Sequence, residues 1–357
     1  MAPSAPRSFA YILLVAPPLV TLLYFLASFP TPSHHLPVPV YPGLASLPAY
    51  SRARAIYPEE WAGNGSYVEF PMGRTQYWLV GPASGKKIVL IHGLSIPALI
   101  WEPIVPQLTA AGYQVLLYDL YGRGYSDAPQ GATYDTSLYL TQLALLLQHL
   151  EWHRTRIMGV SMGGAIAAAF VATFPARVER DVILVASAGL VQSAELSRTS
   201  KFMSSPLVQT LTGNPLVYAY LRRLASKPEA IQRVSSPMNE LVRHQSAHLP
   251  GYNRAISSSL RDGPVTGMHW AFAAARQWQG RRVLLVHGTD DHTVPPAHAP
   301  LIQLLLTTPS EASNDTATQP VPPQVDIARI PGAGHSLTWT HAEEVGRAVC
   351  AFLEGGH

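Results

Sequence analysis

The sequence predicts an α/β domain built on a mostly parallel sheet with helices on both faces. Three observations carry this prediction: short apolar segments recur along the chain, helix-like segments separate them, and hydrophobic residues make up 47% of the 357 residues. Such alternation is typical of parallel sheets, whose strands are joined by helical crossovers. Ligands bind at the carboxyl ends of such strands, so the residues that follow them are the candidates for a site.

The expected elements follow one another in a regular order. A leucine-rich helix is expected at about 137–150, between two central strands. A second helix follows Ser161 and ends near Phe174, because Pro175 disfavours helical geometry in the residue before it. The expected strands are 67–70, 76–80, 87–91, 114–118, 156–160, 182–185, 283–286 and 325–330.

Residues 9–29 (FAYILLVAPPLVTLLYFLASF) are expected to form a single membrane-spanning helix. They carry no charge over a length that matches the bilayer core, and lipid tolerates the two prolines within them. Arg7 precedes the segment and the next arginine is Arg52. This asymmetry places the amino terminus in the cytoplasm and the catalytic part in a lumen or outside the cell.

A cleaved secretory signal is the alternative for the same segment, and the protein would then be secreted. The apolar run is long for a signal, and no A-x-A cleavage site follows it. Glycosylation sequons at Asn64 and Asn314 are compatible with either placement.

Composition excludes several classes of function. The formal net charge is +3 and no run of Lys or Arg occurs, so nucleic acid is not an expected partner. Cys350 is the single cysteine, so neither an intrachain disulfide nor a Cys-rich metal site is possible.

The strongest local motif is GVSMG (159–163), which has the form G-x-S-x-G. It lies between an expected strand and an expected helix, where this motif forms a sharp turn that exposes a nucleophilic serine. Gly159 and Gly163 leave room for the strained turn, because they carry no Cβ. Ser161 is therefore the candidate nucleophile.

A serine hydroxyl needs a base within hydrogen-bond reach, and the chain holds fourteen histidines. His335 lies in PGAGHS (331–336), after the last expected strand, where two glycines allow a loop to hold an imidazole over the edge of the sheet. We predict His335 as the base. Its rivals on nearby loops and helix starts are His292, His298 and His341.

The base needs an acid that fixes its tautomer. HGTDDHTVP (287–295) follows the strand at 283–286 and offers Asp290 and Asp291, either of which can instead cap the next helix. The two aspartates compete for the role of the acid, and the residues alone do not decide between them. The chain order Ser161, Asp291, His335 is the order of one particular hydrolase fold.

The oxyanion formed on attack needs preorganised N–H donors. HGLS (92–95) follows the strand at 87–91, and we expect the backbone N–H groups of Leu94 and Met162 to supply them. His92 and Gly93 support this loop, and His92 is interpreted as structural rather than as the base.

HGLS, YDLYGRGYSD (118–127), GVSMG, HGTDDHTVP and PGAGHS together resemble the α/β-hydrolase superfamily, in the branch with monoacylglycerol lipases, carboxylesterases and carbon–carbon bond hydrolases. The resemblance covers roughly 65–190 and 280–355. It implies an eight-stranded sheet and a helical cap, and places the acid on Asp291. Dehalogenases and epoxide hydrolases of this superfamily carry Asp where this chain has Ser161.

The resemblance and the composition together predict five parts. These are a membrane anchor at 1–30, a Pro-rich linker at 31–60 that is a spacer or a surface strap, a core in two parts at 61–189 and 276–357, and a helical cap at 190–275 between them. The apolar side chains of the cap suggest a lipid-like or aromatic acyl group, or else they pack the cap onto the core.

The predicted function is a membrane-anchored serine hydrolase that cleaves carboxylic esters, lipid-like or with other apolar acyl groups, through an acyl-enzyme. The expected partner is this small-molecule ester, and no metal or organic cofactor is expected. Hydrolysis of a carbon–carbon bond or an amide on the same three residues is the alternative reaction. A non-catalytic binding protein of the same fold is the alternative from another class. The sequence leaves the oligomeric state open.

Overall fold

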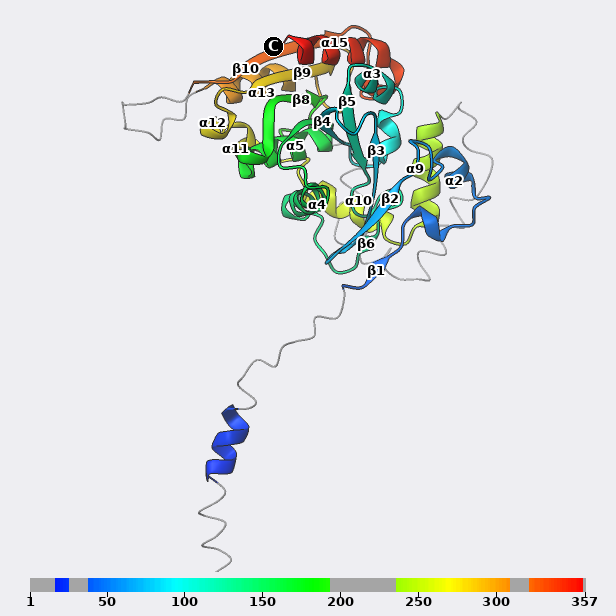
Figure 1. The fold of residues 1–357 in the computed structure, drawn as a ribbon, viewed down its shortest axis with the longest axis vertical. Helices are drawn as coiled ribbons and strands as arrows, with labels where there is room; N and C mark the ends of the chain where they lie inside the picture. Colours follow the sequence, from blue (N-terminus) through cyan, green and yellow to red (C-terminus); the bar gives the residue numbers. More distant parts are fainter. Residues whose placement is uncertain (1–16, 26–37, 193–235, 309–320, 356–357) are drawn as a thin grey trace, which may run out of the picture. The chain divides into compact units, whose positions relative to one another are not determined.

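The computed structural model describes residues 17–25, 38–192, 236–308 and 321–355. The chain divides into two units, 1–38 and 39–357. Of the expected membrane span 9–29, only the helical residues 17–25 are described (Figure 1). None of the described helices combines the length and the hydropathy that crossing a bilayer requires.

The larger unit is built on an eight-stranded sheet in the order β10-β9-β8-β7-β4-β5-β3-β2 (Figure 1). The strands from β10 to β5 pair in parallel, and β3 and β2 add antiparallel at the other end. The mostly parallel sheet is confirmed. The strands are β2 (Ser66–Phe70), β3 (Gly73–Val80), β4 (Lys86–Ile91), β5 (Tyr113–Tyr118), β7 (Thr155–Val160), β8 (Val178–Val185), β9 (Arg282–Gly288) and β10 (Gln324–Ile330).

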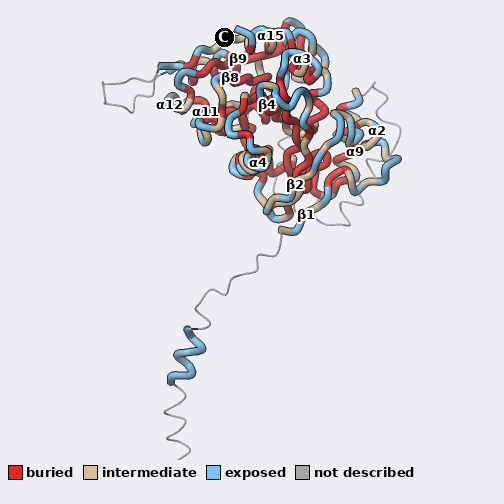
Figure 2. Tube along the Cα trace, in the orientation of Figure 1, coloured by how far each residue is buried: buried red, intermediate tan, exposed pale blue. Residues whose placement is uncertain are grey.

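Helices cover both faces of the sheet, and two cores result. Successive residues of a strand point to opposite faces, so Val89 and Ile91 of β4 enter one core while Ile88 and Leu90 enter the other. Figure 2 shows the buried residues concentrated along the sheet between these layers. One layer contains α4 (Thr136–His149), α5 (Met162–Thr173) and α13 (His298–Thr307), and the other contains α3 (Val105–Ala110) and α15 (Ala342–Glu354).

Local signals explain where two of these helices begin or end. The Asp135 side chain caps α4 by accepting a hydrogen bond from the Leu138 N–H. Helix α5 ends at Thr173, close to the predicted end, because Pro175 follows shortly afterwards.

The described part of the Pro-rich range, 38–60, packs on the domain and is not a free spacer. It forms β1 (Val40–Tyr41), which pairs with β6 (Ala128–Pro129), and then η1 (Leu44–Ser46) and α2 (Arg52–Ile56). Leu44 and Tyr57 are fully buried. This segment is therefore a surface strap on the domain, as one of the two interpretations of the Pro-rich range predicts.

The range predicted as a cap is described from residue 236 onward, and 193–235 lies outside the described residues. It contains α9 (Pro237–His248), α10 (Tyr252–Arg261), α11 (His269–Phe272) and α12 (Ala275–Trp278). Helix α9 lies beside α2 (Figure 1). Both α11 and α12 pack on α5, since Phe272 and Trp278 are buried in the core, so the end of this range belongs to the core layer.

Candidate active site

Ser161 lies in a strained turn between β7 and α5. Its φ is +55° and its ψ −122°, a region that a residue with a Cβ seldom adopts. Glycine is required on both sides of the turn. A Cβ on Gly159 would lie 2.1 Å from the carbonyl oxygen of Gly163, and a Cβ on Gly163 would lie 2.2 Å from that of Ile91.

His335 connects Ser161 to Asp291. Its Nε2 lies 2.9 Å from Ser161 Oγ, and its Nδ1 lies 2.8 Å from Asp291 Oδ2. A carboxylate only accepts, so the Nδ1–H donates to Asp291, which leaves the Nε2 lone pair to accept from the serine hydroxyl. The structure therefore brings together the three residues that the sequence placed on three different loops.

Asp291 rather than Asp290 faces the imidazole. Asp291 is 2% exposed, and its other carboxylate oxygen accepts the N–H groups of Thr293 and Val294 at 2.8 and 2.9 Å. Burial alone would raise the pKa of Asp291, but the nearby His287, the bond from His335 and the Val294 N–H outweigh it and hold that pKa below its ordinary value. Asp290 is exposed and accepts a hydrogen bond from a neighbouring threonine.

The rival histidines take no part in this chain of hydrogen bonds. His341 directly precedes α15 and bonds the Thr340 hydroxyl, and His298 is the first residue of α13. His292 is exposed and lines the cavity described below.

His92 is buried and orients the loop beside Ser161. Its Nδ1–H donates to the Gly93 carbonyl at 2.9 Å, and its Nε2 accepts the Leu120 N–H at 2.9 Å. Burial lowers the pKa of His92 to about 3, so the ring is neutral. Because the peptide is planar and trans, holding the Gly93 carbonyl turns the Leu94 N–H the opposite way.

The two predicted oxyanion donors are open. Within the part of the chain that the structure describes, the N–H groups of Leu94 and Met162 make no hydrogen bond. Met162 is the first residue of α5, where no intrahelical acceptor exists. A Cβ placed on Gly93 would lie 3.3 Å from that of Ser161, so the Gly93–Leu94 peptide is adjacent to the nucleophile.

A cavity of about 330 Å³ opens over Ser161 and His335. Its walls are mainly apolar, and the predicted cap range contributes Leu260 and Val265. The sequence analysis did not single out these two residues, because no motif marks them. Further wall residues are Leu94, Ile96, Ile100, Val191, His292 and Thr293.

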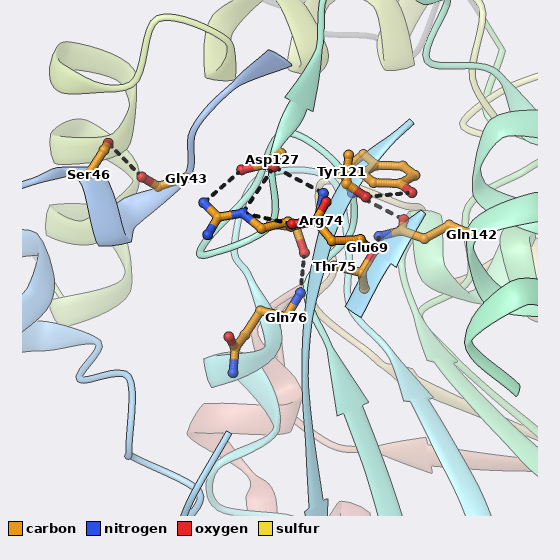
Figure 3. A network of polar contacts seen from close by, with 11 residues as sticks. Gly43, Ser46, Glu69, Arg74, Thr75, Gln76, Tyr121, Asp127 and Gln142 are labelled. Carbon is orange, nitrogen blue, oxygen red and sulfur yellow. Dashed lines mark hydrogen bonds and ion pairs between the residues drawn. The ribbon is translucent and has the colours of Figure 1, made fainter. Parts of the chain in front are cut away.

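The turn that follows β5 lies behind the site and is fastened to β3. The Arg74 side chain and backbone N–H both bond the Asp127 carboxylate (Figure 3). The Gln142 amide donates to Thr75 Oγ1 at 3.0 Å, and its oxygen accepts the Tyr121 N–H at 3.1 Å. These bonds connect the turn to β3 and α4, and the same turn supplies the Leu120 N–H that bonds His92.

A family model for the alpha/beta hydrolase fold matches residues 86–342, and the chain belongs to this family. Among its relatives is a 2-hydroxy-6-oxo-2,4-heptadienoate hydrolase of Pseudomonas putida, 29% identical over 221 residues, which cover 59% of this chain and 74% of that protein. A 2-hydroxymuconate semialdehyde hydrolase of a Pseudomonas species is 30% identical over 223 residues, 59% of this chain and 72% of that one.

Solved structures show the same fold. A membrane phospholipase A described as a bacterial virulence factor aligns with a TM-score of 0.64, 21% identity and 98% coverage of both chains. A meta-cleavage product hydrolase aligns with a TM-score of 0.58 and 20% identity, over 82% of this chain and 98% of that one. At these identities the likeness shows the fold and nothing finer.

Proposed function

We propose that this hydrolase-family protein cleaves carboxylic esters through an acyl-enzyme on Ser161. The observation that carries the proposal is the pair of hydrogen bonds of 2.9 and 2.8 Å that joins Ser161 to His335 and His335 to Asp291. A serine so paired is activated for attack, because the imidazole takes its proton.

The reaction follows from the geometry. Ser161 Oγ attacks the ester carbonyl while His335 Nε2 takes its proton, and the N–H groups of Leu94 and Met162 receive the oxyanion. The imidazolium then protonates the leaving alcohol, and an acyl-enzyme remains. A water molecule, deprotonated by His335, releases the acid. Asp291 holds the imidazole and stabilises its charged form.

The cavity walls favour a substrate with an apolar acyl or alcohol group. Leu94, Ile100, Leu260 and Val265 offer no charge to a ligand, and transfer of apolar surface from water drives binding to such walls. We therefore propose a small, lipid-like ester as the substrate, with no metal or organic cofactor in the reaction.

Hydrolysis of a carbon–carbon bond is the second candidate, and one observation favours it: the two Pseudomonas relatives carry names of hydrolases that act on oxo-dienoate or semialdehyde compounds. The sequence leaves two further alternatives, amide hydrolysis and binding without catalysis. Either would use the same cavity.

One experiment separates these candidates. Purified full-length protein is assayed with p-nitrophenyl esters of increasing chain length, with a 2-hydroxy-6-oxo-dienoate and with an aminoacyl anilide, and Ser161→Ala is the matched control. We expect ester turnover at least about a hundredfold above the control, as loss of the nucleophile predicts. Turnover of the dienoate alone would move the assignment to carbon–carbon cleavage.

The membrane anchor and the luminal or extracellular placement are also proposed. They rest on the uncharged run 9–29 and on Asn64, which is exposed and carries a sequon. Alkaline extraction of membranes from cells that express the full chain tests the anchor, and a glycosidase-sensitive mass shift tests the placement. Release into the alkaline supernatant without a mass shift would contradict both.

A further inference from the structure

Three consecutive carbonyl groups of the loop after β4 are each held by a buried side chain. The Gly93 carbonyl accepts from His92, the Leu94 carbonyl from Arg123 Nε at 2.9 Å, and the Ser95 carbonyl from the Tyr252 hydroxyl at 2.8 Å. Holding successive carbonyls fixes the peptide planes on both sides of Leu94. Leu94 is the residue whose N–H would receive the oxyanion.

Arg123 is fully buried and forms no ion pair with any described acidic residue. Its guanidinium also donates to the Tyr121 carbonyl at 2.8 Å, to the Tyr139 hydroxyl and to Ser259 Oγ at 2.8 Å. Burial of an unpaired charge costs free energy unless its donors are satisfied. The hydrogen bonds of the Arg123 guanidinium all go to neutral oxygen atoms, and one of these oxygens is the Leu94 carbonyl of the loop after β4.

Helix α10 contributes to two of the three attachments of the loop. Tyr252, at its first residue, bonds the Ser95 carbonyl directly, and Ser259, two turns later, bonds the guanidinium that holds Leu94. The Tyr139 and Ser259 hydroxyls lie 2.6 Å apart and close the network. The position of the loop therefore depends on α10 as well as on the sheet.

We propose that Arg123 and Tyr252 are positioning residues that hold the Leu94 N–H in place for the oxyanion. The inference rests on the proposed function of Ser161. Neither residue touches the reacting atoms in this account. Each acts through a loop carbonyl, so their loss weakens binding of the transition state more than binding of the substrate.

Arg281 provides a matched control. It is also a buried arginine, and among the described residues its guanidinium bonds backbone carbonyls alone, those of Pro175, Val178, Glu179 and Gln277. It directly precedes β9 and so lies at the amino ends of the parallel strands, whereas Ser161 lies at their carboxyl ends. Loss of Arg281 removes a comparable set of bonds without touching the loop after β4.

The test compares Arg123→Met, Arg281→Met and Tyr252→Phe in the full chain. For each folded variant, kcat and KM are measured on the best p-nitrophenyl ester, together with the affinity for an alkyl trifluoromethyl ketone, whose adduct with Ser161 carries an oxyanion. We expect kcat to fall about 10- to 100-fold in Arg123→Met and about 3- to 10-fold in Tyr252→Phe, with KM within twofold. Ketone affinity should fall by the same factors.

Arg281→Met should lower thermal stability while kcat and ketone affinity stay within twofold of wild type. Equal kcat losses in Arg123→Met and Arg281→Met would overturn the inference and leave the proposed function standing. If Arg123→Met fails to fold, Tyr252→Phe decides: unchanged kcat and ketone affinity overturn the inference. Wild-type protein that neither cleaves any ester nor binds the ketone would overturn the proposed function and the inference together.

Discussion

The carboxylate of Asp291 lies 2.8 Å from His335 Nδ1, and it is held there by two backbone N–H groups on its other oxygen. The neighbouring Asp290 is exposed, and its carboxylate accepts a hydrogen bond from the Thr289 hydroxyl. Two adjacent acids of one loop are thus placed in opposite environments, and their roles can be separated by substitution.

Asp291→Asn should lower kcat by about 10²–10⁴-fold, because an amide can donate to His335 and so stabilise the wrong tautomer. Asp290→Asn should leave kcat within about twofold. Ester turnover of the two purified variants checks this, with circular dichroism to show that both are folded. The reverse ranking would assign the acid to Asp290.

Gly163→Ala should destabilise the fold by about 2–3 kcal/mol or more, because its Cβ would overlap the Ile91 carbonyl and force the backbone apart. Gly334→Ala is the matched control. Its Cβ would lie 3.7 Å from the nearest atom, the Asp290 carbonyl oxygen, so we expect a loss below about 1 kcal/mol. Urea unfolding measures both, and equal midpoints would contradict the turn geometry.

His92 makes stability depend on pH in a stated direction. Burial lowers its pKa from 6.5 to about 3, so between these values the unfolded chain binds a proton that the folded protein does not. The contribution of this residue to the free energy of unfolding is therefore full above pH 6.5 and is lost as the pH falls toward 3, by about 3 kcal/mol at pH 4. In His92→Gln, the part of the pH dependence of the unfolding free energy that comes from this histidine should vanish.

The measurement is the urea midpoint of wild type and His92→Gln at several pH values between 7 and 4. The change of the midpoint with pH is compared between the two proteins, rather than the midpoint itself, because the substitution also changes stability at every pH. Parallel curves for the two proteins would show that His92 does not carry the pH dependence.

Tyr57 fastens the amino-terminal strap to the core. Its hydroxyl donates to both oxygens of the buried Asp119 at 2.9 and 3.1 Å. Burial raises the pKa of Asp119 to about 7, so Tyr57→Phe should cost about 1–3 kcal/mol, a range that spans hydrogen bonds to neutral and to charged groups. Tyr50, which is 90% exposed, provides the control, and Tyr50→Phe should cost below about 0.5 kcal/mol. Equal thermal midpoints would contradict this attachment.

Most of the fold and the juxtaposition of Ser161, Asp291 and His335 could be predicted from the sequence. Each residue follows an apolar strand, and the carboxyl ends of β7, β9 and β10 meet at one edge of the sheet. The choice between Asp290 and Asp291 depended on a resemblance, because side-chain direction within a loop has no signature in local spacing.

Contacts between segments far apart in the chain could not be predicted. Tyr252 and Ser95 are separated by 157 residues, and Tyr57 and Asp119 by 62. No periodicity links such pairs, since they meet only after the sheet has formed. The same reason explains the buried strap at 38–60, where a high proline content suggested a linker although Leu44 and Tyr57 pack into the core.

The most direct test of the account is labelling of the full-length protein with a fluorophosphonate probe, with Ser161→Ala as control. The probe forms a covalent bond with a serine that an adjacent base activates. We expect rapid labelling of wild type at Ser161, identified by peptide mass, and none in the variant. Folded wild-type protein that stays unlabelled, or a variant that labels equally well, would contradict Ser161 as the nucleophile.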